Sequence, residues 1–267
     1  MLNDRFADKA VMSARQVAEF DHAVERNGGT ADDVKWLSGG DTLAKVFKLR
    51  SGDYVIVSKA ELAGMVPQFR ALADSDVPAR LVDALAKWRR LAADLGYAGP
   101  VAWLVPAGFH FKKHAPLAGP CHQQFQYLQD WKLQDEEHEP TGRQLVFWIP
   151  RVMPESNKKT VAEQLALLAE AREKYGFPEH HLANFGRVSL LSGLMLTHHR
   201  LTQEKTPLSE QWVRTDTLRS GGYQLPLGGG SGEWLYCDYW LDGGPRNGSL
   251  WCFPLGVGSL DPGELEP

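Results

Sequence analysis

The sequence lacks the charge pattern of a protein that binds nucleic acid. Its 29 Lys and Arg residues are outnumbered by 33 Asp and Glu residues, which gives a net charge of −4 and a pI near 6.1. Proteins that bind nucleic acid or anionic membranes concentrate positive charge on one surface. The composition therefore predicts no nucleic-acid partner.

Long apolar runs and paired cysteines are scarce as well. No stretch approaches the roughly 18 apolar residues of a transmembrane helix, so we expect no membrane span. The first residues, MLNDRFADKAVM, lack the basic region and apolar run of a secretory signal. Three cysteines are an odd number, which argues against a complete disulfide framework. We expect a cytoplasmic, reduced protein, and 267 residues are enough to bury a core.

Motifs of common catalytic chemistry are also missing. The chain has no G-x-S-x-G nucleophile elbow and no H-E-x-x-H zinc motif. GGGSGE at 228–233 lacks the Lys-Ser/Thr pair that completes a phosphate-binding loop. DEEHE at 135–139 sets carboxylates beside His138, as general acid–base catalysis requires. An acidic run before a proline is more typical of a solvated turn. We predict a protein without enzymatic activity and without a cofactor.

One group of metal-ligating residue types keeps an enzymatic alternative open. HFKKHAPLAGPCH contains His110, His114, Cys121 and His122, and imidazole and thiolate are zinc ligands. These four residues would serve a zinc-dependent hydrolase. Two prolines and the lack of a second chelating pair favour a solvated loop, and we expect no bound zinc. The histidine pairs at 180–181 and 198–199 are expected on helix surfaces, because adjacent residues face different directions.

The first third of the chain has mainly helical spacing. Residues 8–29 place apolar side chains on one helical face before two glycines, and Leu43, Val46 and Phe47 follow the same spacing. YVIV at 54–57 is the first strand pattern. Residues 75–97 carry an apolar helical stripe that ends at Gly96. We predict a small helical N-terminal unit over residues 1–99.

The remainder predicts an α+β domain over residues 100–257. Strand patterns occupy 100–105, 124–133 and 144–149, and an amphipathic helix ends at Gly176. The helix around 186–201 is apolar almost all round, so Val188, Leu191, Leu194 and Met195 are expected in the core. Beyond residue 210, glycine clusters separate short apolar runs, which predicts short antiparallel strands without helix. The tail, 258–267, is predicted to be disordered.

The most unusual stretch is GGYQLPLGGGSGEWLYCDYWLDGGPRNGSLWCF, residues 221–253. It holds three of the nine tryptophans and nine of the 26 glycines, so rigid aromatic side chains alternate with turn residues. Successive side chains of a strand face opposite sides. Leu235, Cys237, Leu250 and Cys252 are therefore predicted to face the core, and Phe253 the opposite side.

Large outward aromatic side chains are typical of binding hot spots. The predicted binding face consists of Tyr223, Trp234, Tyr236, Asp238, Trp240, Asp242, Arg246, Asn247, Ser249 and Trp251. The alternative is a structural protein in which the aromatic strands form core or an oligomer interface.

Several segments resemble a known family. LSGLMLTHHRLTQEKTPL, WVRTDT…SGG and PLGV at 254–257 are similar to the C-terminal domains of variable proteins made by diversity-generating retroelements. NGGTADDVKWLSGGDTLAKV resembles the N-terminal part of the same group. The resemblance implies a C-type-lectin-like domain, preceded by the helical unit, that displays a diversified region at about 221–253. The implied partner is a protein or a cell-surface ligand.

The tryptophans depart from the family's pattern. Its mutagenesis replaces adenines, typically in Asn codons, which yields Tyr, Asp, Ser, Asn, Gly or Arg but not Trp. Tyr236, Asp238, Arg246, Asn247 and Ser249 fit this rule. Trp234, Trp240 and Trp251 therefore belong to the scaffold or come from other template codons. The chain also lacks the G-F-R ending of many such domains.

Overall fold

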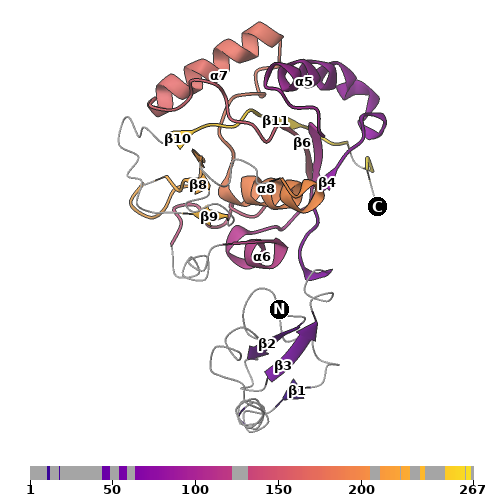
Figure 1. Cartoon of the computed structure of the whole chain (residues 1–267), viewed down its shortest axis with the longest axis vertical. Helices are drawn as coiled ribbons and strands as arrows, with labels where there is room; N and C mark the ends of the chain where they lie inside the picture. The colour runs from indigo at the N-terminus through magenta and orange to yellow at the C-terminus, as the bar shows by residue number, and fades with distance from the viewer. Residues whose placement is uncertain are drawn as a thin grey trace. The chain divides into compact units, whose positions relative to one another are not determined.

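The computed structural model of the chain contains two compact units, Met1–Val66 and Pro67–Pro267 (Figure 1). The boundary predicted at residues 99–100 lies inside the second unit. The residues that the structure describes are 11–12, 18, 44–48, 54–58, 64–121, 132–204, 211–222, 224–228, 235–237, 250–261 and 263–265.

The first unit contains a three-stranded antiparallel sheet of order β1-β3-β2. Its strands are β1 (Val11–Met12), β2 (Ala44–Lys48) and β3 (Tyr54–Ser58). β3 confirms the strand predicted at 54–57. The helical pattern predicted for this region is wrong at β1 and β2, which are strands, and most of its other residues lie outside the described part of the chain. Val46 pairs with Ile56, so pairing with the strongly apolar β3 prevails over a helical spacing of only three residues.

The main sheet of the second unit is antiparallel throughout, with the order β11-β6-β5-β4. Its strands are β4 (Arg70–Ala71), β5 (Ala102–Val105), β6 (Gln144–Trp148) and β11 (Leu255–Gly258). β5 and β6 confirm the strands predicted at 100–105 and 144–149. The first and last strands of the unit therefore form the two edges of one sheet.

Helices cover this sheet, and α5 and α7 lie together on one side of it while α6 and α8 lie on the other (Figure 1). The helical elements are η1 (Asp74–Asp76), η2 (Ala79–Leu81), α5 (Val82–Asp94), α6 (Phe111–Ala118), α7 (Val161–Tyr175) and α8 (Val188–Thr202). α7 begins at a capping box of Thr160 and Glu163 and ends at Gly176, whose φ is 67°. The α+β fold class is thus established. No described helix is long and apolar enough to cross a membrane.

The core beneath α5 is built around one tryptophan. Trp88 is fully buried and stacks on Phe147 of β6, with ring centroids 5.8 Å apart. Its indole Nε1 donates a hydrogen bond to Nδ1 of His181 at 3.1 Å, which satisfies the polar atom inside the core. His181 is only 1% exposed, so the expectation of a surface histidine is wrong at this position.

α8 is the most deeply buried helix. Every residue from Val188 to His198 is buried, including Leu191, Leu194 and Met195, which confirms the predicted core helix. Packing explains the glycine at position 193, because a Cβ there would lie 2.1 Å from the ring of Phe69. His198 is 1% exposed, and the surface position expected for it is wrong.

A second sheet contains the C-terminal aromatic segment, in the order β10-β7-β8-β9. Its two-residue strands are β7 (Trp212–Val213), β8 (Leu227–Gly228), β9 (Tyr236–Cys237) and β10 (Leu250–Trp251). The described residues between 211 and 253 contain strands and no helix, as predicted. The pairing of β10 with β7 is parallel, whereas antiparallel strands were expected throughout.

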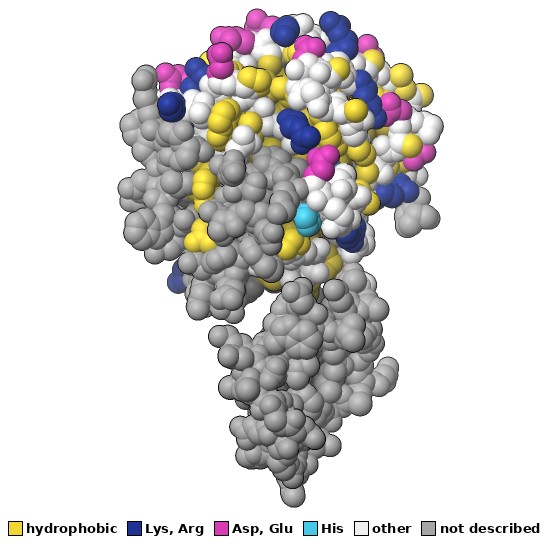
Figure 2. All heavy atoms as spheres, viewed as in Figure 1, with side chains coloured by type: hydrophobic (Ala, Val, Ile, Leu, Met, Phe, Trp, Pro, Cys, Tyr) yellow, Lys and Arg dark blue, Asp and Glu magenta, His cyan; other side chains and the backbone are white. Residues whose placement is uncertain are grey.

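The C-terminal tail is held against the domain. Arg80 donates hydrogen bonds to Asp261 and Glu264, and Arg143 donates to the carbonyl oxygens of Glu264 and Leu265. The predicted disorder is therefore wrong for residues 258–261 and 263–265, because Arg80 binds acidic side chains of the tail and Arg143 binds its backbone carbonyl groups. Figure 2 shows acidic and basic side chains interspersed over the coloured part of the visible face.

Candidate functional site

The predicted binding segment contributes one aromatic row to the second sheet. Trp212 pairs with Gly228, and Gly228 pairs with Tyr236, so these residues share one face of the sheet. Gly228 has no side chain, and the rings on either side of it meet edge to face with centroids 5.3 Å apart. Both aromatic side chains are half-buried. Trp212 was not predicted as a site residue, although it precedes Val213 in an alternating pattern.

The neighbouring row is buried where it crosses β7, β8 and β9. Val213, Leu227 and Cys237 are 0%, 0% and 2% exposed. The four residues predicted to face the core are all buried: Leu235, Cys237, Leu250 and Cys252. Strand alternation therefore separates a core row from an aromatic row in this part of the chain.

The separation into two rows fails at β10. The half-buried Trp251 pairs with Val213 of the buried row, and the buried Leu250 pairs with Trp212 of the aromatic row. Phe253, predicted to face outward, is fully buried and packs against Trp148 with ring centroids 5.4 Å apart. The reason is that the strand ends at Trp251 and the alternation of strand side chains does not continue.

Most of the predicted binding face lies outside the described residues. This holds for Tyr223, Trp234, Asp238, Trp240, Asp242, Arg246, Asn247 and Ser249. The structure therefore brings together Tyr236 and Trp212, and it separates Trp251 from them.

A buried arginine, Arg214, connects the second sheet to its surroundings by hydrogen bonds. Arg214 is 1% exposed, and its guanidinium donates to Gln164 at 2.7 Å, to Gln224 at 2.5 Å and to the carbonyl oxygen of Lys159 at 3.4 Å. Burial lowers the pKa of this guanidinium. Gln164 of α7 also donates to the carbonyl oxygen of Leu250 at 2.9 Å. These contacts fasten the second sheet to α7 without using the aromatic row.

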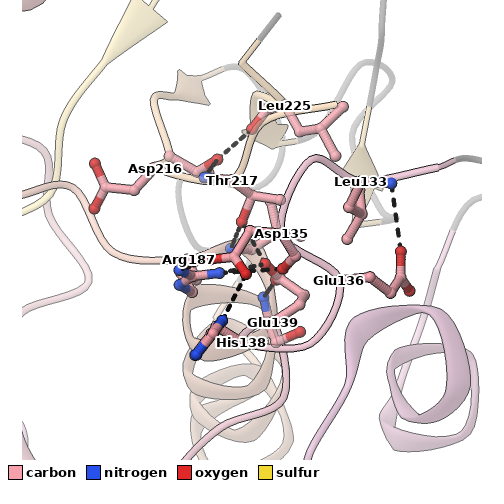
Figure 3. Close-up of polar contacts among 12 residues, drawn as sticks. Leu133, Asp135, Glu136, His138, Glu139, Arg187, Asp216, Thr217 and Leu225 are labelled. Atoms are coloured by element: carbon pink, nitrogen blue, oxygen red, sulfur yellow. Dashed lines mark hydrogen bonds and ion pairs between the residues drawn. The ribbon is translucent and has the colours of Figure 1, made fainter. Parts of the chain in front are cut away.

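A polar network surrounds the start of α8 (Figure 3). Glu139 is 1% exposed; it accepts hydrogen bonds from the backbone N–H of Ser189 and the hydroxyl of Thr217, both at 2.8 Å. Arg187 lies 3.7 Å from the same carboxylate. A carboxylate is favoured at a helix N-terminus, although burial raises the pKa of Glu139. The solvated turn expected at 135–139 is therefore wrong at its last residue.

The other acidic residues of this segment lie nearer the surface. Asp135 pairs with Arg187 and with His138, both at 2.6 Å, and the hydrogen bond from Arg187 is the main cause of its lowered pKa. Glu136 pairs with Lys112 of α6 at 2.9 Å. The acidic run thus links two helices that are far apart in sequence.

A pocket of about 410 Å³ opens beside this network. Asp216 accepts hydrogen bonds from the backbone N–H groups of Phe185 and Gly186 at 3.1 and 2.7 Å. The pocket offers carboxylate acceptors and an apolar floor to a small ligand. Its lining consists of His138, Glu139, Pro140, Thr141, Gly142, Gln144, Asn184, Gly186, Arg187, Leu190, Asp216, Leu255 and Val257. None of the predicted binding or metal residues is among them.

The predicted metal residues do not form a metal site in the described part of the chain. His110 caps α6: its Nδ1 accepts from the backbone N–H of Lys112 at 3.2 Å, and its Nε2 lies 3.1 Å from Glu136. Nδ1 of His114 accepts from the backbone N–H of His110 at 2.8 Å. Burial raises the pKa of the Cys121 thiol, and His122 lies outside the described residues.

The loop expected around the predicted metal residues is wrong, because residues 111–118 form α6. Pro116 lies inside this helix. A proline removes one backbone donor. The cap at His110 supplies an additional hydrogen bond at the other end of this short helix.

Comparison of the chain with family models, with curated proteins and with solved structures finds no match. Assignment of a function therefore depends on the residues and their geometry.

Proposed function

We propose that this protein is a non-enzymatic ligand-binding module of the kind that diversity-generating retroelements modify. In this proposal the second unit is a C-type-lectin-like scaffold without a cofactor, and the segment 221–253 carries the binding face. One observation carries the proposal: in β7, β8 and β9 the buried residues Val213, Leu227 and Cys237 lie beside a row in which Trp212 and Tyr236 keep part of their surface.

The aromatic row suits binding for a physical reason. The side chains of Trp212 and Tyr236 each have two rotatable bonds, so they offer a large contact area at a small cost in conformational entropy. Their edge-to-face contact restricts both rings further. A partner that covers them gains apolar contact without first ordering long, flexible side chains.

The contacts that hold the second sheet in place favour a binding face that tolerates substitution. The hydrogen bonds of Arg214 and Gln164 hold the strands through side-chain amide and backbone acceptors, and the core row fills the space beneath. None of these contacts involves Tyr236. A diversified surface requires this separation, because residues that vary cannot also maintain the fold.

The proposed face comprises the outward residues predicted from the sequence, with Trp212 added and Trp251 assigned to the scaffold. A protein or a cell-surface ligand as partner and a cytoplasmic location belong to the same proposal. The zinc-hydrolase alternative gains no support, because both ring nitrogens of His110 already face protein groups.

Two libraries of the full chain test the proposal. The first randomises the five positions that fit the mutagenesis rule: Tyr236, Asp238, Arg246, Asn247 and Ser249. The matched control library randomises the core residues Leu235, Cys237, Leu250 and Cys252. We expect most members of the first library and few members of the second to fold, as measured by protease resistance. Equal losses in both libraries would favour the structural-protein alternative.

The genetic origin needs an independent observation. In the DNA beside the gene, we expect a near-copy of the segment that encodes residues 221–253, differing from it at adenines, together with a reverse transcriptase gene. If members of the first library fold but the DNA contains no such repeat, the binding-module proposal stands and the retroelement is excluded from it.

A further inference from the structure

Three buried polar atoms of the described residues have no hydrogen-bond partner in the protein. They are Oη of Tyr97, Nε1 of Trp148 and Nδ1 of His198. Their residues are 7%, 0% and 1% exposed. Buried polar atoms without partners are rare in folded proteins, and each one destabilises the fold unless another molecule satisfies it.

These three residues form one cluster, although they come from the loop after α5, from β6 and from α8. The ring of His198 lies with its centroid 6.0 Å from that of Tyr97 and 6.1 Å from that of Trp148. Trp103 packs against the same imidazole at 6.3 Å and against Trp148 at 5.7 Å. His198 is therefore enclosed by three aromatic rings.

Other buried indoles of the same unit find acceptors within the protein. Nε1 of Trp88 donates to His181, and Nε1 of Trp103 donates to the carbonyl oxygen of Trp148 at 3.2 Å. Trp148 is equally buried but has no such acceptor. The missing partner is therefore a property of this cluster and not of buried indoles in the unit.

Neighbouring groups determine which hydrogen-bonding roles the cluster offers. Nε2 of His198 lies 3.4 Å from the carboxylate of Glu204, so we assign the proton to Nε2, which leaves a lone pair on Nδ1 of the neutral ring. Burial lowers the pKa of His198 and raises the pKa of Tyr97 to about 12, so the imidazole and the phenol are both neutral at pH 7. Arg151 lies over the Tyr97 ring and 3.5 Å from Glu204.

The cluster thus offers two donors, the indole N–H of Trp148 and the hydroxyl of Tyr97, and one acceptor, Nδ1 of His198. The chemical group that complements this set is a hydroxyl, which accepts two hydrogen bonds and donates one. We propose that the cluster is an internal binding site for one hydroxyl group, from a water molecule or a small alcohol. This inference is independent of the proposed function.

Water-to-protein magnetisation transfer in the ¹⁵N-labelled full chain tests the site. We expect a cross-peak between the indole Hε1 of Trp148 and a long-lived bound hydroxyl, and none at the indoles of Trp88 and Trp103, which serve as internal controls. The Tyr97→Phe variant removes only the phenol oxygen. A cross-peak that persists in this variant comes from the bound hydroxyl and not from the phenol of Tyr97, and its absence in the parent protein would overturn the proposal.

Methanol distinguishes the two sources of the hydroxyl. A saturating shift of the Trp148 Hε1 resonance, with loss of the water cross-peak, identifies an alcohol site, and no shift with a retained cross-peak identifies a water site. Absence of both signals overturns the proposal. The ¹⁵N shifts of His198 provide a second measurement: we expect an unprotonated Nδ1, and a protonated Nδ1 contradicts the assigned acceptor.

Discussion

Trp212 and Tyr236 meet edge to face across Gly228, with ring centroids 5.3 Å apart. The contact exists because the residue between them in the sheet has no side chain. It also joins two strands that are separated in sequence by a glycine-rich segment. The partly exposed surface of this sheet is therefore organised by packing between strands as well as by alternation along each strand.

Gly228→Ala is expected to lower the free energy of unfolding by about 1–3 kcal/mol. A Cβ at this position would lie 2.4 Å from the carbonyl oxygen of Gln211, and backbone must move to accommodate it. Urea denaturation measures the change. Gly142→Ala is the matched control, because a Cβ there meets no atom within 4 Å. A Gly228→Ala variant as stable as the control would contradict the described pairing of β7 and β8.

Leu194→Ala is expected to destabilise the protein by about 2–5 kcal/mol, because Leu194 is fully buried and its truncation leaves a cavity in the core. Leu201→Ala, on the same helix but at a side chain that is 57% exposed, should change stability by less than about 0.5 kcal/mol. Thermal unfolding of the two variants provides the comparison. Similar losses at both positions would show that α8 does not pack as described.

Glu139→Ala is expected to cost about 1–3 kcal/mol of stability. The substitution leaves the backbone N–H of Ser189 and the hydroxyl of Thr217 without their acceptor inside the protein. Glu137→Ala removes an exposed carboxylate from the same segment and is the control. Chemical denaturation should separate the two variants, and equal stabilities would mean that Glu139 is solvated.

Stability is expected to fall as the pH decreases from about 6.5 to about 4. Burial lowers the pKa of His181 to about 4 in the folded protein. In the unfolded chain the same imidazole binds a proton near pH 6.5, so between these pH values only the unfolded state is protonated at this residue. Protonation then favours the unfolded state, by roughly 3 kcal/mol below pH 4 for this residue. Burial lowers the pKa values of His110 and His198 as well, which acts in the same direction.

Denaturation at several pH values measures this dependence. His180→Gln, a change at the exposed neighbour, should leave the pH dependence in place. Stability that stays constant between pH 6.5 and 4 would show that His181 is accessible to protons in the folded state.

Elements encoded by local sequence were predictable. The capping box at Thr160 and the glycine at 176 delimit α7, and the continuous apolar surface of α8 predicts its burial. Strands β5 and β6 follow from compact apolar runs. In each case the deciding signal lies within the element itself, so no tertiary contact was needed to recognise it.

Features that depend on distant contacts were not predictable. Glu139 is buried because its partners Ser189 and Thr217 lie 50 and 78 residues away in the sequence. His181 and His198 are buried by aromatic rings from other elements. Phe253 follows the end of β10, where strand alternation no longer applies, and it packs on Trp148. Trp212 lies beside Tyr236 because both residues pair with Gly228, and a single sequence does not reveal this strand pairing.

The central claim is that the outward residues of the aromatic segment are separable from the fold, and the melting temperatures of Leu235→Ala and Tyr236→Ala test it most directly. Leu235 is fully buried, so its truncation should cost about 2–5 kcal/mol and lower the melting temperature by at least about 5 °C. Tyr236→Ala removes an edge-to-face contact with Trp212, which is worth about 0.5–1.5 kcal/mol, and leaves the buried row in place. Its melting temperature should therefore stay within a few degrees of the parent protein. Unfolding caused by Tyr236→Ala, to the same extent as by Leu235→Ala, would make the segment core and contradict the binding-module account.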